Sequence, residues 1–235
     1  MSFAGLGKEE WREAMATAPG SNGPAQSEWG RLAQQVRGLE KYRAAKRIFI
    51  DPSPVLSQVR INALVDGKEL LMPAPGLNDG FYLCLPYVIP FADLSYATTY
   101  HGLPRFGRLL DNRALASKAV DFLLTDAVAV DAQGVRLGDG NGFFDLTCAI
   151  LAELGAVDRQ LASFVGVVAD EQVVAESLPV DPWDVLLDEV VTPSGGQAFP
   201  AKGHVQPAIY WSHLASERIR RMNPLWKLSA ENRDK

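Results

Sequence analysis

The spacing of apolar residues alternates along this chain between a helical and a strand pattern. Spacings of three and four predict helices at 8–16, 28–45, 54–65 and 143–154. Short continuous apolar runs predict strands at 47–50, 68–72, 80–85, 121–130, 164–169 and 187–192. Continuous runs are typical of strands that are buried on both faces in a parallel sheet covered by helices. The pattern therefore predicts a three-layer α/β protein with an open, largely parallel sheet.

The same pattern divides the chain into three parts. Residues 1–27 hold the first helix and a flexible linker, because a run rich in proline and glycine, 19–24, interrupts the helical spacing. Residues 28–193 form the α/β domain. Residues 194–235 form a C-terminal tail that packs on the domain or extends from it. Within the domain, the segment 86–113 contains Pro86, Pro90 and Pro104 and is predicted to be irregular.

Composition limits the class of protein and its partners. The chain has 235 residues, 47% of them hydrophobic, and a formal net charge of −5, which indicates a globular protein and argues against a nucleic-acid partner. Cys84 and Cys148 lie in apolar surroundings without the spacing of a zinc site or a disulfide scaffold. The sequence shows no signal pattern and no apolar run of about 20 residues, so we expect a cytoplasmic protein without a membrane partner.

The segment from Arg136 to Asp145 carries the strongest chemical signal. Its sequence is Arg-Leu-Gly-Asp-Gly-Asn-Gly-Phe-Phe-Asp, and its alternate glycines let backbone N–H groups converge on an anion at the start of a helix. Asp-Gly and Asn-Gly are also typical of tight hairpin turns, which need no ligand. A strand at 127–131 and a helix from residue 143 place the glycines between strand and helix, which favours a phosphate site.

Several familiar catalytic motifs are missing from the sequence. There is no G-x-x-x-x-G-K-[ST] loop, no G-x-G-x-x-G after a first strand, no G-x-S-x-G and no H-E-x-x-H. The histidines at 101, 204 and 213 have no partner at ligand spacing, so we assign them no role.

Five short motifs occur in the order and spacing of a known family. They are Lys8-x-x-x-Arg12, the glycine segment, Asp170-Glu171-Gln172, Leu178-Pro179 and Asp184-x-x-x-Asp188-x-x-x-Thr192. Together they resemble the 5-formyltetrahydrofolate cyclo-ligase family, also called methenyltetrahydrofolate synthetase, over most of the chain from residue 8 to about 193. The resemblance is closer to a divergent branch of that family.

This resemblance implies a fold and a reaction. Family members are similar in fold to sugar-phosphate isomerases and CoA transferases. They use ATP and Mg²⁺ to activate the formyl oxygen of 5-formyltetrahydrofolate as a phosphate ester, and attack by a ring nitrogen then expels phosphate to give 5,10-methenyltetrahydrofolate. In such reactions the protein chiefly positions groups and neutralises charge. We expect a reduced folate as substrate, ATP and Mg²⁺ as cofactors, and a monomer or homodimer.

The resemblance also assigns residues to the site. It implies that ATP phosphates are bound by Lys8, Arg12, Arg136, Gly138, Gly140 and Gly142. It makes Arg136 and Asp145 catalytic, and Asp145 and Asp184 magnesium ligands. The substrate would meet Asn141, Phe143 and Phe144, while Gln172 and the acid before it would shape the base of the pocket.

Structural alternatives exist for these assignments. Lys8 and Arg12 also fit a solvated helix face, and Asp145 also fits a carboxylate that faces a helix dipole. Asp184 also fits a cap of a turn after Pro182, and Gln172 equally fits packing or backbone hydrogen bonding.

Some positions depart from the family pattern. Asp139 and Asn141 stand between the glycines, Phe143 and Phe144 replace tyrosines, and Asp51 stands where the family has a glutamate. An anion about 4 Å from a phosphate costs roughly 1 kcal/mol in water and about 4 kcal/mol at an intermediate dielectric, unless it points away or meets a cation.

These departures leave more than one function open. The leading hypothesis is the cyclo-ligase. The alternative is a divergent paralogue that binds or processes a different heterocyclic or phosphorylated metabolite. An interaction module that uses the basic segment 218–227 ranks below both, because a solvated terminal helix explains that segment.

Overall fold

The computed structural model describes residues 5–18, 22–200 and 205–231. Its described residues form an eight-stranded sheet in the order β11-β10-β8-β5-β1-β2-β3-β4. Strands β10, β8, β5, β1 and β2 are parallel, and β3, β4 and β11 are antiparallel to their neighbours. The bounds are β1 Arg47–Ile50, β2 Glu69–Pro73, β3 Phe81–Cys84, β4 Arg108–Leu110, β5 Phe122–Asp126, β8 Ser163–Val167, β10 Glu189–Thr192 and β11 Gly195–Ala198.

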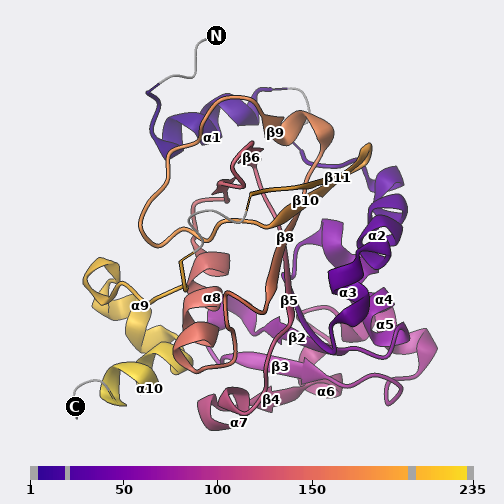
Figure 1. Cartoon of the computed structure of the whole chain (residues 1–235). Helices are drawn as coiled ribbons and strands as arrows, with labels where there is room; N and C mark the ends of the chain where they lie inside the picture. Colours follow the sequence, from indigo (N-terminus) through magenta and orange to yellow (C-terminus); the bar gives the residue numbers. More distant parts are fainter. Residues whose placement is uncertain (1–4, 19–21, 201–204, 232–235) are drawn as a thin grey trace.

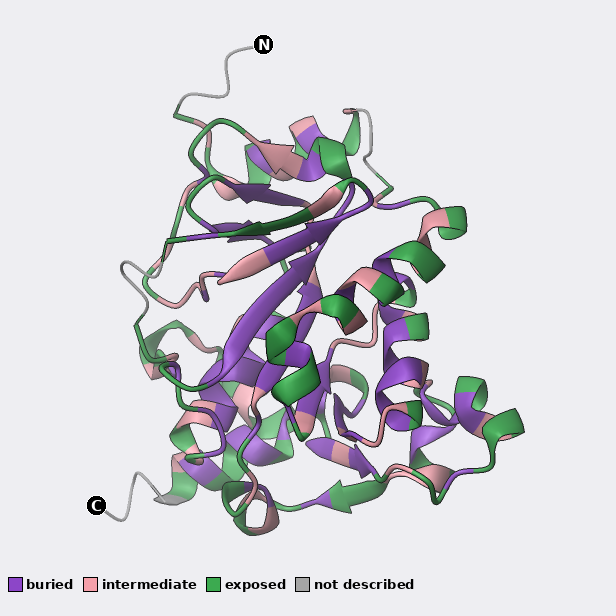
Figure 2. Ribbon diagram, turned by 45° about the vertical axis from the view of Figure 1, so that its right-hand side comes forward, coloured by how far each residue is buried: buried purple, intermediate pink, exposed green. Residues whose placement is uncertain are grey.

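Helices cover both faces of this sheet (Figure 1). In β1, Phe49 packs into the core on the side of α8 (Phe143–Glu153) and α10 (Asn223–Glu231). Ile48 and Ile50 pack on the other side, against α2 (Trp29–Gly38), α3 (Glu40–Ala44) and α4 (Ser57–Val65). This alternation explains the continuous apolar runs, because successive side chains enter opposite cores. Figure 2 shows the central strands buried and the outer turns of the helices exposed. The predicted three-layer α/β class is confirmed.

A second sheet of three short strands lies beside the carboxyl ends of the parallel strands. It has the order β7-β6-β9, with β7 Arg136–Leu137, β6 Ala129–Asp131 and β9 Val173–Val174. The first helix, α1 (Lys8–Ala16), buries Trp11 and Met15 against this sheet. The four-residue spacing that predicted this helix therefore also identified its buried face.

Three sequence predictions need correction. The helix predicted at 28–45 is two helices, because Leu39 has an extended backbone with φ −63° and ψ 133°. The strand predicted at 121–130 is β5 and β6, which belong to different sheets. The region 86–113, predicted as irregular, contains α5 Leu94–Ala97, α6 Leu103–Phe106, β4 and the start of α7 Asn112–Ala116.

Single turns of 3₁₀ helix also occur at Gln26–Glu28, Pro54–Leu56, Pro75–Leu77, Phe91–Asp93, Asp170–Gln172 and Trp211–His213.

The described part of the C-terminal tail is built into the domain. Met222, Leu225 and Leu228 are buried in the same core as α8. Gln206 accepts a hydrogen bond from the backbone N–H of Arg159 at 2.8 Å and donates one to the carbonyl of Val157 at 2.8 Å. The segment that includes α9 (Ser216–Arg221) and α10 therefore packs on the α/β layers rather than extending from them. Among the described residues, no helix is both long enough and apolar enough to cross a bilayer.

The linker predicted at 19–24 lies partly outside the described residues, which omit 19–21. Its described end is tied to the domain. The indole N–H of Trp29 donates to the carbonyl of Pro24 at 3.0 Å, and Asn22, Gly23 and Pro24 line the cavity described next.

Candidate functional site

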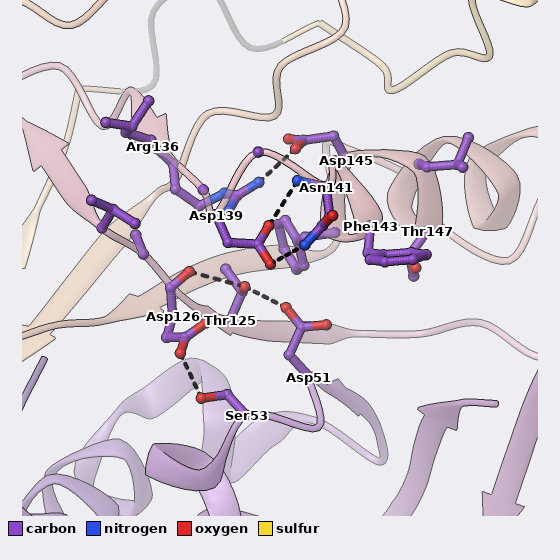
Figure 3. A pocket seen from close by; sticks show the side chains of 18 of the residues that line it. Asp51, Ser53, Thr125, Asp126, Arg136, Asp139, Asn141, Phe143, Asp145 and Thr147 are labelled. Carbon is purple, nitrogen blue, oxygen red and sulfur yellow. Dashed lines mark hydrogen bonds and ion pairs between the residues drawn. The ribbon is translucent and has the colours of Figure 1, made fainter. Parts of the chain in front are cut away.

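A cavity of about 930 Å³ opens between the two sheets at the carboxyl ends of β1 and β5. Its walls come from α1, the connection from β7 to α8, the start of α8, and the C-terminal segment. Figure 3 shows the part of this wall where the strand ends face the glycine loop. Of the site residues predicted from the sequence, Glu171, the acid before Gln172, is exposed and does not line this cavity. The others lie on its wall: Lys8, Arg12, Arg136, Gly138, Gly140, Asn141, Gly142, Phe143, Phe144, Asp145, Gln172 and Asp184.

The glycine loop, residues 138–142, connects β7 to α8. The strand that leads into it is β7, and the predicted strand at 127–131 is separated from it by a hairpin turn through Gly134. Gly140 has φ +96°, and Gly142, the residue just before α8, has φ +63°, so both use the left-handed region that favours glycine. A Cβ at Gly138 would lie 2.5 Å from Nη1 of Arg136. The glycines are therefore explained by a strand-to-helix connection, and the loop itself is not a hairpin turn.

Arg136 lies buried beneath this loop. Its Nη2 forms an ion pair with Oδ2 of Asp145 at 2.5 Å, and its guanidinium lies 5.0 Å from the ring centre of Phe144 (Figure 3). Burial acts to lower the pKa of Arg136, but Asp145 and the other nearby acids outweigh it and the pKa is raised. Its Nε has no hydrogen-bond partner among the described residues. The guanidinium is thus a permanent cation with one donor to spare at the base of the loop.

The first helix folds over the loop and brings two more cations to it. Nε of Arg12 donates to the carbonyl of Gly138 at 2.8 Å, and the Arg12 guanidinium lies against Gly140. Nζ of Lys8 forms ion pairs with Asp184 and, at 2.7 Å, with Asp181. The alternative of a simply solvated face does not describe these two side chains, because both contact the wall of the cavity.

Asp145 and Asp184 both line the cavity, and Asp184 lies close enough to Asp145 to feel its charge. Oδ1 of Asp145 accepts from the N–H of Val185 at 3.0 Å, and Oδ2 of Asp184 accepts from the N–H of Asp181 at 2.7 Å. Burial, together with the charge of Asp145, raises the pKa of Asp184 despite its bonds to Lys8 and Asp181. No group of three or more acidic, histidine or cysteine side chains able to hold a metal occurs in the described ranges.

This donor set nevertheless fits a magnesium ion that arrives with a phosphate. Mg²⁺ retains several waters and is usually held by one or two carboxylates plus phosphate oxygens. Asp145 and Asp184 supply two such carboxylates, each now paired with a cation, Arg136 or Lys8. Their role as metal ligands stays a prediction.

Asp139 turns back onto the loop. Its Oδ1 accepts from the backbone N–H of Asn141 at 3.0 Å, and its Oδ2 accepts from Nδ2 of Asn141 at 2.7 Å (Figure 3). The side chain is exposed and lies on the cavity wall. This Asx turn uses the backbone N–H and one side-chain N–H of Asn141, and it leaves one negative charge in a loop otherwise surrounded by cations.

The two phenylalanines at the start of α8 have different surroundings. Phe144 is only 3% exposed and packs on Phe49 and Arg136 in the core. Phe143 is 38% exposed, and the guanidinium of Arg218 lies 5.4 Å from its ring centre. The open stacking face predicted for a substrate ring is therefore that of Phe143.

Gln172 is held by the backbone of the domain. Its Oε1 accepts from the N–H of Ala169 at 2.7 Å, and its Nε2 donates to the carbonyls of Ala127 at 3.0 Å and Val128 at 3.2 Å. These bonds support the backbone-bonding alternative. Gln172 fixes the connection between β5 and β6, which forms the base of the pocket.

The strand ends contribute acids that were not among the predicted site residues. Asp51 follows β1 and accepts a hydrogen bond from Oγ1 of Thr125 in β5, while Oγ of Ser53 donates to Asp126 at 2.5 Å (Figure 3). Burial raises the pKa of Asp51 to about 7, against the lowering effect of Thr125. Sequence reasoning noted Asp51 only as a replacement for a family glutamate, because its burial depends on the fold.

The C-terminal segment supplies an aromatic part of the wall that sequence reasoning missed. Tyr210 and His213 lie against Trp183, with ring centres 5.9 Å and 4.6 Å from the indole. Nη2 of Arg218 donates to the carbonyl of Asn141 in the glycine loop at 2.6 Å. No local sequence signal predicts this convergence, since the bond joins residues 77 positions apart.

Comparisons with known proteins identify relatives of this chain. The chain is 30% identical over 203 residues to the human methenyltetrahydrofolate synthase domain-containing protein, covering 84% of this chain and 51% of that protein. It is 44% identical over 75 residues to 5-formyltetrahydrofolate cyclo-ligase of Escherichia coli K12, covering 32% and 37% of the two chains. The chain thus spans about half the length of the domain-containing relatives it matches.

A solved structure shows the same fold. The Aquifex aeolicus 5,10-methenyltetrahydrofolate synthetase matches with a TM-score of 0.54 and 23% identity, covering 88% of this chain and 99% of that one. The sequence profile described as the 5-formyltetrahydrofolate cyclo-ligase family matches residues 8–193. The chain belongs to the 5-formyltetrahydrofolate cyclo-ligase family.

Proposed function

We propose that this chain is an ATP- and Mg²⁺-dependent cyclo-ligase that converts 5-formyltetrahydrofolate to 5,10-methenyltetrahydrofolate. One observation carries the proposal: the family motifs, which lie far apart in the sequence, meet around one cavity. Lys8, Arg12 and Arg136 reach it from two elements, and the glycine loop lies between them. A cationic pocket with a side-chain-free loop at a helix start suits a polyphosphate.

The cations would hold the phosphate chain. Lys8 and Arg12 are one helical turn apart on α1, and both already contact the wall with their charged ends. A phosphate group is the kind of anion that would replace Asp184 as the partner of Lys8. The N–H groups of the loop and of the first turn of α8 would add neutral donors. Arg136 would neutralise charge from beneath the loop.

Asp145 and Asp184 would hold Mg²⁺, which supplies charge neutralisation on the phosphates when bound. Their pairing with Arg136 and Lys8 keeps both carboxylates in place before a ligand arrives. Binding of metal and phosphate together would exchange these partners, and the charge of the metal would offset part of the negative charge that the phosphates bring into the pocket. We therefore expect metal and nucleotide to bind cooperatively.

Asp51 would face the heterocycle of the folate. Its carboxyl lies at the inner end of the cavity, beside Thr125 and Arg136, and its pKa of about 7 lets it accept or donate a hydrogen bond near neutral pH. Such a group can bind the N–H pattern of a reduced pterin and can hold a proton close to the reacting ring.

The direct test mixes purified protein with 5-formyltetrahydrofolate, ATP and Mg²⁺ and follows the absorbance of the methenyl product. We expect product formation that requires all three reactants. Lys8→Ala should lower kcat/KM for ATP at least about ten-fold, which corresponds to about 1.4 kcal/mol. Lys41→Ala, at an exposed position of α3, is the matched control and should leave the rate unchanged. Absence of product at high enzyme concentration would contradict the proposal.

A second function is favoured by the departures in the loop. Asp139 keeps a negative charge on the cavity wall, and Asp51 is shorter than the family glutamate. In this second function the chain is a paralogue without cyclo-ligase activity, and its pocket binds or processes a different heterocyclic or phosphorylated metabolite. A thermal-shift panel separates the two. Stabilisation by folate together with ATP supports the cyclo-ligase, and stabilisation by unrelated metabolites alone supports the paralogue. The cytoplasmic location, and the monomer or homodimer, stay predictions.

A further inference from the structure

The C-terminal segment completes the cavity, although it follows the last residue of the family match at 193. Its residues on the cavity wall are Ala208, Ile209, Tyr210, His213, Leu214 and Arg218. Ile209 is buried in the main core, and the backbone N–H of Asn223 donates to the carbonyl of Asn78 at 2.9 Å. The segment is therefore fixed in position by the domain and forms a wall of the site.

This wall carries an aromatic cluster, formed by Trp183, Tyr210 and His213. The Trp183 and Tyr210 rings meet edge to face at 68°, and the Trp183 and His213 rings are tilted by 45°. Tyr210 and Phe143 remain 37% and 38% exposed, so aromatic surface is open at the cavity rim. Aromatic side chains arranged in this way are typical of sites that stack a planar ring.

The position of the cluster identifies the end of the ligand that it would meet. Trp183 lies between Asp181 and Asp184 in the sequence, and both of these carboxylates hold Lys8. The aromatic cluster therefore borders the part of the cavity wall where Lys8 lies.

Arg218 links this wall to the glycine loop. Its guanidinium lies over the ring of Phe143 at 5.4 Å and donates to the Asn141 carbonyl at 2.6 Å. Burial lowers the pKa of Arg218, but an arginine remains charged at neutral pH. The contact holds the loop and the C-terminal segment at a fixed separation and adds a cation near the loop.

We propose that residues 208–218 form a subsite for the planar base of a nucleotide whose phosphates occupy the glycine loop. The ring would lie against the aromatic cluster, and Arg218 would keep the loop at the correct distance from it. This inference rests on the proposed function, because it takes ATP as the ligand. It adds a part of the chain that lies outside the family match to the binding machinery.

The test compares binding of ATP with binding of inorganic tripolyphosphate, which has the same charged chain and no base. Both are titrated calorimetrically with Mg²⁺ and without folate, using the full chain and the variants Tyr210→Ala and His213→Ala. We expect each variant to bind ATP on the order of ten-fold more weakly and tripolyphosphate within two-fold of the unmodified protein. Trp226→Ala is the matched control, because Trp226 is 45% exposed on α10, outside the described cavity lining.

Several results would overturn the inference. These are unchanged ATP affinity in both variants, equal weakening of ATP and tripolyphosphate, or weakening confined to 5-formyltetrahydrofolate. If the unmodified protein binds neither ATP nor tripolyphosphate, the proposed function fails and this inference fails with it. If the unmodified protein binds ATP and makes the methenyl product while the variants bind ATP normally, only the inference fails. Circular dichroism of each variant identifies any loss of folding.

Arg218→Ala provides a second, independent measurement. Arg221→Ala, at an exposed position of the same helix, is its control. We expect Arg218→Ala to weaken ATP more than Arg221→Ala does, by about ten-fold, and to increase hydrogen exchange at the loop amides 138–142. Loop exchange that is equal in the two variants would contradict the role given to Arg218.

Discussion

Arg136 and Asp145, nine residues apart, flank the glycine loop and form a buried ion pair across its base. The pair joins β7, at its first residue, to the first turn of α8, so the loop between these elements has fixed ends. Asp145 also accepts from the N–H of Val185, which ties the same carboxylate to the segment that carries Asp184. The shape of the proposed phosphate cradle is thus set by the protein before any ligand binds.

This relationship predicts a large loss of stability when one partner is neutralised. Asp145→Asn keeps the size of the side chain but leaves the Arg136 charge buried without a counter-ion, which costs about 3–5 kcal/mol. Urea denaturation at neutral pH measures the change. The control is Glu9→Gln, in the exposed pair with Arg12, where we expect a change of at most about 1 kcal/mol. Equal losses in the two variants would show that the Arg136 pair is as solvated as a surface pair.

Asp51 predicts an unusual dependence of stability on pH. Its pKa rises on folding from 3.8 to about 7, because burial disfavours the charged form. The folded chain therefore binds this proton more tightly than the unfolded chain does. The contribution of Asp51 to stability is full below about pH 4, declines as the pH rises towards 7, and is constant above that. The total decline corresponds to about 4 kcal/mol.

Asp51→Asn should remove this penalty. We expect the free energy of unfolding of the variant, relative to the original protein, to increase steadily between pH 4.5 and 7.5. Asp170→Asn is a control of opposite sign, because the hydrogen bond from Thr192 lowers the pKa of Asp170 and that carboxylate stabilises the protein at neutral pH. A pH-independent difference for Asp51→Asn would mean that this carboxyl ionises normally. Chemical denaturation at several pH values provides the measurement.

A glycine with positive φ lies next to each end of α8, so substituting each in turn separates the effect of backbone strain on stability from the effect of the loop on ligand binding. Gly142 directly precedes the helix with φ +63°, Gly155 follows it with φ +71°, and a Cβ at either would meet no atom within 4 Å. Gly142→Ala and Gly155→Ala should therefore destabilise the protein by similar amounts, about 1–2 kcal/mol, since each forces alanine into the left-handed region. Only Gly142→Ala should weaken tripolyphosphate binding, measured by calorimetry. Equal effects on binding would remove the loop from the phosphate site.

The accuracy of the sequence predictions varied with the range of the interactions involved. The spacing of Trp11 and Met15 is local, so the helix and its buried face were predicted together. The amphipathic stripe of 28–45 continues across Leu39, and nothing in it marks the break in the backbone. The apolar run 121–130 likewise does not show that the chain leaves the main sheet after Asp126.

The site residues were also predicted from the sequence only where a local motif marks them. The family motifs identified Lys8, Arg12 and the glycine loop, and these residues do meet on one cavity wall. The buried acid Asp51 and the aromatic contact of Tyr210 with Trp183 depend on tertiary packing between distant segments, and no spacing reveals them. The sequence therefore predicted the glycine loop and the cations beside it, but not the acidic and aromatic parts of the same cavity wall.

Asp139 leads to a prediction of improved binding. Its carboxylate holds Asn141 in an Asx turn, so asparagine at position 139 can keep the acceptor for the backbone N–H while removing the charge. A charge about 4 Å from a phosphate is worth about 1 kcal/mol in water, and the exposed side chain places the effect near that lower limit. We expect Asp139→Asn to bind tripolyphosphate and ATP about five-fold more tightly at low ionic strength, with the gain declining as salt is added.

Asp158→Asn is the matched control, because Asp158 is exposed, makes the same turn with the N–H of Gln160 at 2.8 Å and lies outside the described cavity lining. Calorimetric titration at two salt concentrations measures the affinities. An equal or weaker affinity of Asp139→Asn would contradict the prediction and would mean that the Asp139 carboxylate favours binding. That result is expected if the ligand carries a positive charge or an N–H donor at the loop.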